Sequence, residues 1–212
     1  SPYNSIRLIL GLDRNGDHDR ENRFVRAARC WTQWRAEEIL IQDEQPGFYV
    51  YEQEFNSPPG GIRRRLGLVC LLRLEDYENK VVLPHERTFP GPKADLVRLL
   101  EATQANFSQI FCFYQDRAGS IEDLLKAQIR IQPKLEVTDE EEVIHRLWPI
   151  YSPAIINHLQ SYFSDKQVFI ADGHHRYESA LEYSRRRSSG SDKPHDFVLA
   201  ALFNADEDLT IL

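Results

Sequence analysis

Phe48–Leu74 reads FYVYEQEFNSPPGGIRRRLGLVCLLRL and consists of two alternating runs on either side of a breaker. In the first run, Phe48–Phe55, aromatic side chains alternate with a valine and glutamates, and in the second, Ile62–Leu74, apolar residues recur with a period of two. This period is typical of a strand with one buried face. The breaker Ser57–Gly61 contains two prolines and two glycines, which favour a turn. The stretch therefore predicts an antiparallel hairpin.

Further helices and strands are expected on both sides of this hairpin, because apolar residues recur at helical spacing in some segments and form short runs in others. Helices are predicted over Asp19–Leu40, around Leu96–Thr103, over Ser120–Ile129, from Ser152 onward and near Gly173–Arg187. Strands are predicted over Ser5–Leu10, Ile110–Tyr114, Leu135–Val137, Val143–Trp148, Val168–Ala171 and Phe197–Phe203, with a loop over Val81–Pro92. Strand pairs mixed with helices predict the α+β class, with mixed, mostly antiparallel sheets, flanking helices and a single unit over residues 1–212.

The composition is that of a folded protein, since 42% of the 212 residues are hydrophobic, 11% aromatic and 28% charged. These values exclude intrinsic disorder and a collagen-like repeat. The longest apolar stretches, such as Leu66–Leu72, are far shorter than the roughly 20 residues that cross a membrane, so no membrane partner is expected. The chain contains no methionine, and we expect it to be the central fragment of a longer protein.

The charge and the cysteines restrict partners and compartment. A net charge of −7 repels phosphate backbones and speaks against nucleic acid as a partner. The short basic runs Arg63–Arg65 and Arg185–Arg187 could bind a small anion, although such runs are usually solvated. The three cysteines, Cys30, Cys70 and Cys112, form no CxxC pair and lie among apolar residues, which predicts reduced thiols and a cytoplasmic protein.

The strongest candidate for a functional site is Val168–Glu178, VFIADGHHRYE, where an apolar strand runs directly into a helix. The free N–H groups and the dipole at a helix N-terminus bind anions, and phosphate above all. Gly173 lets a ligand approach the backbone, and His175 and Arg176 add donors for phosphate oxygens. Asp172, at the end of the strand, could hold Mg²⁺ or take a proton from a hydroxyl.

The same residues also fit a purely structural role. Asp172 is a favoured N-cap residue. His174 shares a helix face with Tyr177 and Leu181, which is typical of a partly buried structural histidine, and it can pair with Glu178 four residues on. Adjacent histidines on a helix point about 100° apart and rarely bind one metal together. A zinc site is disfavoured because no second cluster of histidines or cysteines has ligand spacing.

A second candidate is the loop Leu83–Asp95, LPHERTFPGPKAD, in which ionisable residues are crowded between prolines. Glu86 could act as a general base, and Lys93, near the predicted start of a helix, could contact a phosphate. The alternative is a solvated surface loop. The two segments form one site only if this loop lies over the turn at Asp172–Arg176.

Several segments together resemble the domain of unknown function 1015 family, a large bacterial and archaeal family. The matching segments follow the family order along nearly the whole chain: Ser1–Leu8 (SPYNSIRL), Tyr49–Phe55 (YVYEQEF), Leu83–Glu86 (LPHE), Pro90–Asp95 (PGPKAD) and Ile170–Glu178 (IADGHHRYE). Members of that family extend beyond this chain on both sides, so the resemblance implies that the chain is the middle of a full protein.

The Asp-Gly-His-His-Arg turn also resembles the ParB/sulfiredoxin-like superfamily, whose members bind nucleotide phosphates at a comparable turn and include free-serine kinases that use ADP or ATP. The resemblance implies a ParB/sulfiredoxin-like core and the following site residues: Asp172 for Mg²⁺ and catalysis, and Gly173, His174, His175 and Arg176 for phosphate. It also implies that Glu86 activates the acceptor hydroxyl. No helix-turn-helix follows and the sulfiredoxin cysteine is absent, which speaks against DNA partitioning and sulfinic-acid repair.

These observations lead us to expect a phosphotransferase that uses ADP or ATP with Mg²⁺ and acts on a small hydroxylated metabolite such as free serine. Phosphoryl transfer depends on phosphate positioning and charge neutralisation more than on covalent chemistry. The alternatives are a non-catalytic sensor of a nucleotide or phosphometabolite, and a metal-dependent phosphatase that uses the histidines and Asp172. The expected partners are a small-molecule substrate and a nucleotide, and the sequence does not determine the oligomeric state.

Overall fold

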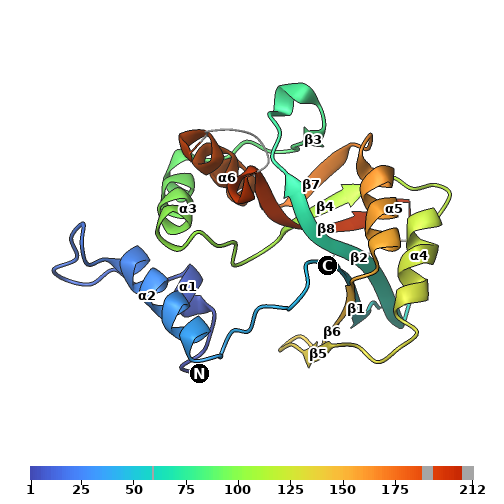
Figure 1. The fold of residues 1–212 in the computed structure, drawn as a ribbon, viewed down its shortest axis with the longest axis horizontal. Helices are drawn as coiled ribbons and strands as arrows, with labels where there is room; N and C mark the ends of the chain where they lie inside the picture. Colours follow the sequence, from blue (N-terminus) through green and yellow to red (C-terminus); the bar gives the residue numbers. More distant parts are fainter. Residues whose placement is uncertain (59, 188–192, 207–212) are drawn as a thin grey trace.

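The computed structural model describes residues 1–58, 60–187 and 193–206 (Figure 1). Its helices are α1 (Ile6–Ile9), α2 (Arg23–Ala36), α3 (Pro90–Thr103), α4 (Ser120–Gln128), α5 (Pro153–Phe163) and α6 (His174–Arg187), with short 3₁₀ helices η1 (Tyr77–Asn79) and η2 (Pro194–Asp196). Its strands are β1 (Phe48–Asn56), β2 (Ile62–Arg73), β3 (Val82–Leu83), β4 (Ile110–Tyr114), β5 (Leu135–Thr138), β6 (Ile144–Ile150), β7 (Val168–Asp172) and β8 (Phe197–Asn204).

Within these described residues, the strands form a single eight-stranded sheet in the order β3-β7-β4-β8-β2-β1-β6-β5. Strand β3 pairs with β7 and β4 with β8 in parallel, whereas the other five pairings are antiparallel. The α+β class and the mixed, mostly antiparallel pairing agree with the sequence prediction, although the strands form one sheet rather than several. The predicted hairpin is β1 and β2, in which Tyr51 lies opposite Gly67; Pro59 of the breaker lies outside the described residues.

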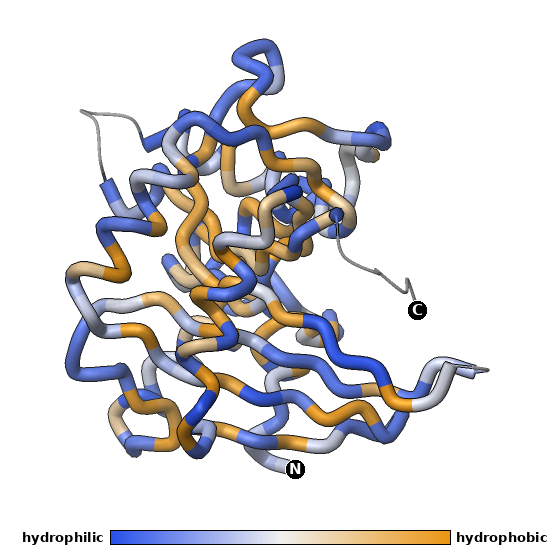
Figure 2. The backbone as a smooth tube through the Cα atoms, turned by 90° about the vertical axis from the view of Figure 1, so that its right-hand side faces the viewer, coloured by the Kyte–Doolittle hydropathy of each residue, from blue (hydrophilic) through white to orange (hydrophobic). Residues whose placement is uncertain are grey.

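One face of the sheet is covered by α4, α5 and α6. Alternate residues of the central strands, such as Ile110 and Cys112 of β4, are fully buried, and they belong to one core with Leu159 of α5 and Tyr177 of α6. Burial of apolar surface of this kind is the main favourable term in folding. Figure 2 shows the hydrophobic segments concentrated in the interior of the molecule.

The opposite face of the sheet carries the intervening side chains of the same strands, because successive residues of a strand point to opposite sides. Phe169 of β7 is 40% exposed and Leu71 of β2 is 59% exposed. Phe111 and Phe113 of β4 are half-buried. Aromatic side chains therefore remain accessible along β7 and β4, at the side where β7 leads into α6.

Helices α1, α2 and α3 form a layer beside α6, since α3 packs against both α6 and α2, and α2 packs against α1 (Figure 1). Leu8, Phe24 and Leu99 are buried within this layer. No helix in the described part of the chain combines the length and the hydrophobicity needed to cross a lipid bilayer.

Three sequence predictions of local structure are corrected. Ser5–Leu10 is not a strand but contains the short helix α1, in which Asn4 Oδ1 accepts the N–H of Ile6 at 2.9 Å and so favours a helical start. The helix predicted over Asp19–Leu40 begins only at Arg23, because the Asn22 side chain caps it. The predicted loop after residue 80 contains β3 and the first residues of α3.

Candidate functional site

The candidate site is centred on the end of β7, where the strand stops at Asp172 and α6 begins at His174. Gly173 between them has a φ of +96°, which glycine adopts without strain. A Cβ added there would lie 2.9 Å from Arg176 Nε and 3.0 Å from Ile110 Cγ2. The missing side chain thus lets the Arg176 guanidinium lie against the start of the helix.

The strand pairing is irregular at the same place. Asp172 lies opposite Phe111 while Ile170 lies opposite Cys112, so Ala171 is an extra residue on β7. Such bulges turn the end of a strand and redirect its side chains. As a result Asp172 lies opposite Phe111 and lines the same cavity, whereas the side chain of Ile170 stays buried in the core.

Arg176 is held at the start of α6 by two acceptors. Its NH1 donates to the carbonyl oxygen of Gln109 at 2.7 Å, and its NH2 pairs with the Asp172 carboxylate. The side chain of Asp172 is 76% exposed. Exposed ion pairs contribute little to stability, so a ligand can separate this pair at low cost.

The loop after β3 lies against the first turn of α6, so the two segments singled out in the sequence meet. The backbone N–H of His85 donates to His174 Nε2 at 3.2 Å, and His85 Nδ1 lies 2.7 Å from the carbonyl oxygen of Ile170. The two rings meet edge to face, with centroids 4.5 Å apart. Burial, together with the neighbouring His85, lowers the pKa of His174, which keeps the ring neutral and its Nε2 able to accept.

The next residues of α6 hold the rest of the loop. His175 Nε2 accepts the N–H of Phe89 at 3.0 Å, and the two rings are stacked. Glu178 Oε2 accepts from Thr88 Oγ1 at 2.5 Å and from Lys93 Nζ at 2.8 Å. Burial acts to raise the pKa of Glu178, but the bonds from Lys93 and Thr88 outweigh it, so the pKa is lowered. The loop and α6 therefore form one hydrogen-bonded unit.

A cavity of about 680 Å³ opens beside this unit, on the face of the sheet that α4, α5 and α6 leave uncovered. Its lining includes three phenylalanines and four charged or ionisable side chains: Phe111, Phe113, Phe169, Arg65, His85, Asp172 and Arg176. Small-molecule sites are typically of this size, with apolar walls and a few polar groups that fix orientation.

Arg65 enters the cavity from β2 and is fixed by its neighbours. Its guanidinium carbon lies 5.4 Å from the ring centroid of Phe111 and 5.6 Å from that of Phe203, and its Nε donates to Gln53 Oε1 at 2.6 Å. Burial lowers the pKa of this guanidinium, yet an arginine remains charged at neutral pH. The cavity thus has cationic side chains from both β2 and α6.

The residues predicted for the site fall into two groups, those at the cavity and those that connect α6 to the loop. Asp172 and Arg176 line the cavity and Gly173 adjoins it. The remaining predicted residues are not in its described lining but join α6 to the loop: Glu86, Lys93, His174 and His175. Their proposed roles in catalysis and phosphate binding stay predictions.

Sequence reasoning did not assign His85 or Arg65 to the site. Both lay in segments that it did single out, the loop Leu83–Asp95 and the basic run Arg63–Arg65. The alternation of β2 could have indicated that Arg65 shares a sheet face with Gly67. However, β2 lies between β8 and β1, with β4 beyond β8, and that strand order is not readable from spacing.

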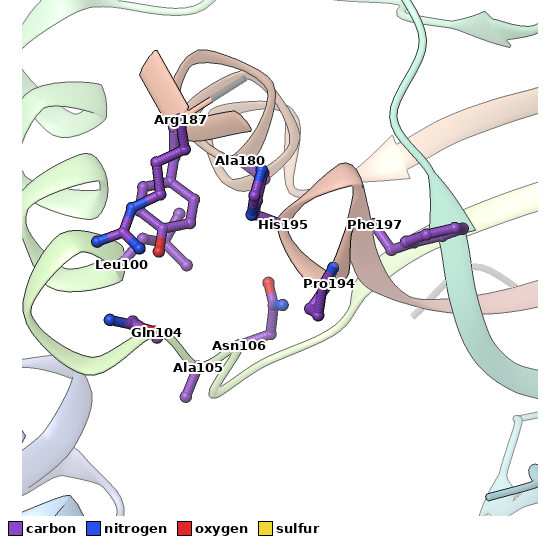
Figure 3. Close-up of a pocket in the computed structure, with 10 residues that line it drawn as sticks. Leu100, Gln104, Ala105, Asn106, Ala180, Arg187, Pro194, His195 and Phe197 are labelled. Carbon is purple, nitrogen blue, oxygen red and sulfur yellow. The ribbon is translucent and has the colours of Figure 1, made fainter. Parts of the chain in front are cut away.

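A smaller cavity of about 250 Å³ lies between α3, α6 and η2 (Figure 3). Its lining includes Asn106, Arg187 and His195, and the guanidinium of Arg187 lies 5.0 Å from the ring centroid of Tyr183. No residue of the Asp172 turn or the Leu83–Asp95 loop belongs to its described lining, so it is separate from the candidate site.

Comparison with known families gives one match, to the model described as Protein of unknown function (DUF1015), over residues 1–212. The chain belongs to this family. Searches of curated proteins and of solved structures found no match. The family match covers the turn, the loop and every lining residue of the cavity in this DUF1015 chain.

Proposed function

We propose that this DUF1015 chain binds a nucleotide, ADP or ATP, in the cavity beside Asp172 and transfers a phosphoryl group to a hydroxyl of a small metabolite such as free serine. The observation that carries this proposal is the combination, in one cavity of about 680 Å³, of aromatic walls with two arginines and a carboxylate.

The aromatic wall suits the base of the nucleotide. Phe111, Phe113 and Phe169 line the cavity from neighbouring strands. A nucleobase is planar and stacks on an aromatic ring, and each stacked base contributes about 1–3 kcal/mol. Phe169 is 40% exposed without a ligand, so covering it would bury apolar surface.

The cationic side suits the phosphates. Arg176 can grip phosphate oxygens through two nitrogens, and Arg65 supplies a second charge from β2. Arg176 belongs to the first turn of α6, so the positive end of the helix dipole adds to the attraction for an anion at its side chain. Because Asp172 competes for Arg176, a phosphate would replace an exposed ion pair rather than a buried one.

In the transfer step, the acceptor oxygen bonds to the terminal phosphorus of the nucleotide, the bond from that phosphorus to the bridging oxygen breaks, and the shortened nucleotide leaves. The acceptor proton passes to a carboxylate. Asp172 lines the cavity and is better placed for this than Glu86, whose Oε1 lies 3.0 Å from His174 Nδ1. Arg65 and Arg176 stabilise the charge on the transferred group.

Magnesium fits this arrangement. Mg²⁺ prefers hard oxygen ligands and is commonly bound by one or two carboxylates together with substrate phosphates. Asp172 is exposed in the cavity and supplies such an oxygen. An ion held there would neutralise phosphate charge.

Isothermal titration calorimetry of the chain with ADP or ATP and Mg²⁺ tests the proposal. Arg176→Gln should weaken binding about 10- to 100-fold, the loss expected for a charge-assisted hydrogen bond. Arg130→Gln, an exposed arginine outside the described lining of the cavity, is the matched control and should bind like wild type. Absence of nucleotide binding by the wild-type chain would contradict the proposal.

A coupled assay separates the alternatives. Transfer of phosphate to serine, abolished in Asp172→Asn, supports the phosphotransferase. Nucleotide binding with no turnover on any hydroxylated acceptor would favour the sensor. Release of inorganic phosphate from a phosphomonoester without nucleotide would favour the metal-dependent phosphatase.

A further inference from the structure

We propose that His85, Glu86 and His174 form a binding site for a divalent transition-metal ion, of which Zn²⁺ is the probe, at the edge of the cavity. One ligand atom from each of the three residues lies within 4.8 Å of the others. This site is distinct from the Mg²⁺ site proposed at Asp172. Metal binding to it does not depend on nucleotide binding.

His85 is already oriented as a metal ligand. Its Nδ1 lies 2.7 Å from the carbonyl oxygen of Ile170, and since a carbonyl can only accept, Nδ1 carries the ring proton. The lone pair is then on Nε2. Histidines that bind metals commonly donate their other ring N–H to a backbone carbonyl, which fixes the tautomer and the ring orientation.

His174 supplies the independent observation. Its side chain is fully buried, and its Nδ1 has no hydrogen-bond partner. Leaving a buried polar atom without a partner is destabilising, so such an atom calls for an explanation. A metal ion bound to Nδ1 would satisfy it.

Glu86 stands next to that orphaned nitrogen. Its Oε1 lies 3.0 Å from His174 Nδ1, yet the two are not aligned for a hydrogen bond. Two ligand atoms that share one metal at bonds of about 2.0–2.2 Å lie roughly 3.3–3.6 Å apart in a tetrahedral site, with both lone pairs aimed at the ion instead of at each other, so only a small separation of the two atoms is needed. Close approach without alignment is therefore what two ligands of one ion would show.

Metal binding has one identifiable cost. The His85 N–H now donates to His174 Nε2 at 3.2 Å, and a ring that binds metal through Nδ1 carries its proton on Nε2. That bond must therefore open. His85 is exposed, so its amide can donate to water instead. Because the net contribution of one hydrogen bond to stability is small, its loss is outweighed by the free energy of binding the metal to three ligands.

The donor set selects the kind of ion. Two imidazoles and one carboxylate suit Zn²⁺ and other first-row transition metals better than Mg²⁺ or Ca²⁺, which prefer oxygen. Three protein ligands leave a coordination position for water or for an oxygen of a bound ligand. Since His85 also lines the cavity, the ion would sit within reach of what the cavity holds.

The test is metal content after dialysis of the purified chain against Zn²⁺ and then against metal-free buffer. We expect one Zn²⁺ per chain in wild type and loss of stoichiometric binding in His85→Gln and in Glu86→Gln, both exposed positions whose replacement leaves the core intact. His158→Gln, an exposed histidine on α5, is the matched control and should retain the ion.

The ¹⁵N spectrum of His174 gives a readout that does not depend on variants. Zinc should change the Nδ1 resonance of His174 from its metal-free position. The proposal is overturned if wild type retains no Zn²⁺, if His85→Gln retains as much as wild type, or if zinc leaves the His174 resonances unmoved. Failure of this test leaves nucleotide binding by Arg65 and Arg176 to be judged by calorimetry.

Discussion

Backbone groups determine which ring nitrogen carries the proton in His85 and which accepts a hydrogen bond in His174. The carbonyl of Ile170 fixes the proton of His85 on Nδ1, and the N–H of His85 makes Nε2 of His174 an acceptor. Neither contact joins residues close in sequence. The motif Ile170–Glu178 predicted where the site is, but spacing along a helix paired His174 with Glu178, whereas the fold places it against His85 and Glu86.

A glycine is required at position 173 because its φ is positive and because neighbouring atoms leave no room for a Cβ. Gly173→Ala forces a side chain into a φ of +96° and to within 3.0 Å of Arg176 and Ile110. We expect a loss of about 1–3 kcal/mol in the free energy of unfolding, measured by urea titration. Gly91→Ala in α3, where a Cβ meets nothing within 4 Å, is the control and should be neutral or stabilising. Equal stability of the two variants would contradict this view of the turn.

Glu178 predicts a pH dependence of stability. Its pKa is lowered from the ordinary value of 4.5, so its ionised form is favoured in the folded state. The resulting stabilisation is present above about pH 4.5 and is lost as the pH falls through the lower, folded-state value. The difference in unfolding free energy between wild type and Glu178→Gln should therefore shrink below that pH. Glu182→Gln, a neighbour on α6 whose carboxylate pairs with Arg186, is the control and should change the free energy of unfolding little.

At the scale of elements, hydrophobic periodicity predicted the longer helices and strands. It failed for short elements whose structure depends on tertiary contacts. The hairpin β1–β2, strand β4 and helix α6 fall where alternation or helical spacing placed them. Ser5–Leu10 is short and apolar, a pattern that fits a strand or a helix, and packing of Leu8 in the layer with α2 decides for α1. Strand β3 is two residues long and exists because β7 lies beside it, which no local pattern reports.

At the same scale, the hydrogen bonds that attach the Leu83–Asp95 loop to α6 can be tested. His175→Ala removes the acceptor for the Phe89 N–H, so hydrogen exchange at Phe89 should accelerate about tenfold, the loss of one hydrogen bond. Exchange at Ile121, whose N–H is bonded to Asp116 near the start of α4, should not change. Unaltered exchange at Phe89 would show that the loop is held by other contacts.

At the scale of the molecule, the two faces of the sheet should respond differently to truncation. Leu159 of α5 is fully buried on the covered face, and Leu159→Ala should cost about 2–5 kcal/mol of unfolding free energy. Leu71→Ala on the other face, where the leucine is 59% exposed, should cost well under 1 kcal/mol. Similar losses at both positions would mean that the second face is also packed.

The sequence predicted a folded protein of the α+β class, but it did not predict the cavity. Its wall needs Phe111, Phe169 and Arg65 on three strands whose order in the sheet is not sequential, and a bulge at Ala171 that brings Asp172 to the same side. Such long-range arrangements follow from the packing of the entire chain.

The most direct test of the central claim is a structure of this chain crystallised with ADP or ATP and Mg²⁺. We expect the phosphates to lie at Arg176 and Arg65 and the base to stack against Phe111, Phe113 or Phe169. A nucleotide bound elsewhere on the molecule, with this cavity holding only solvent, would contradict it.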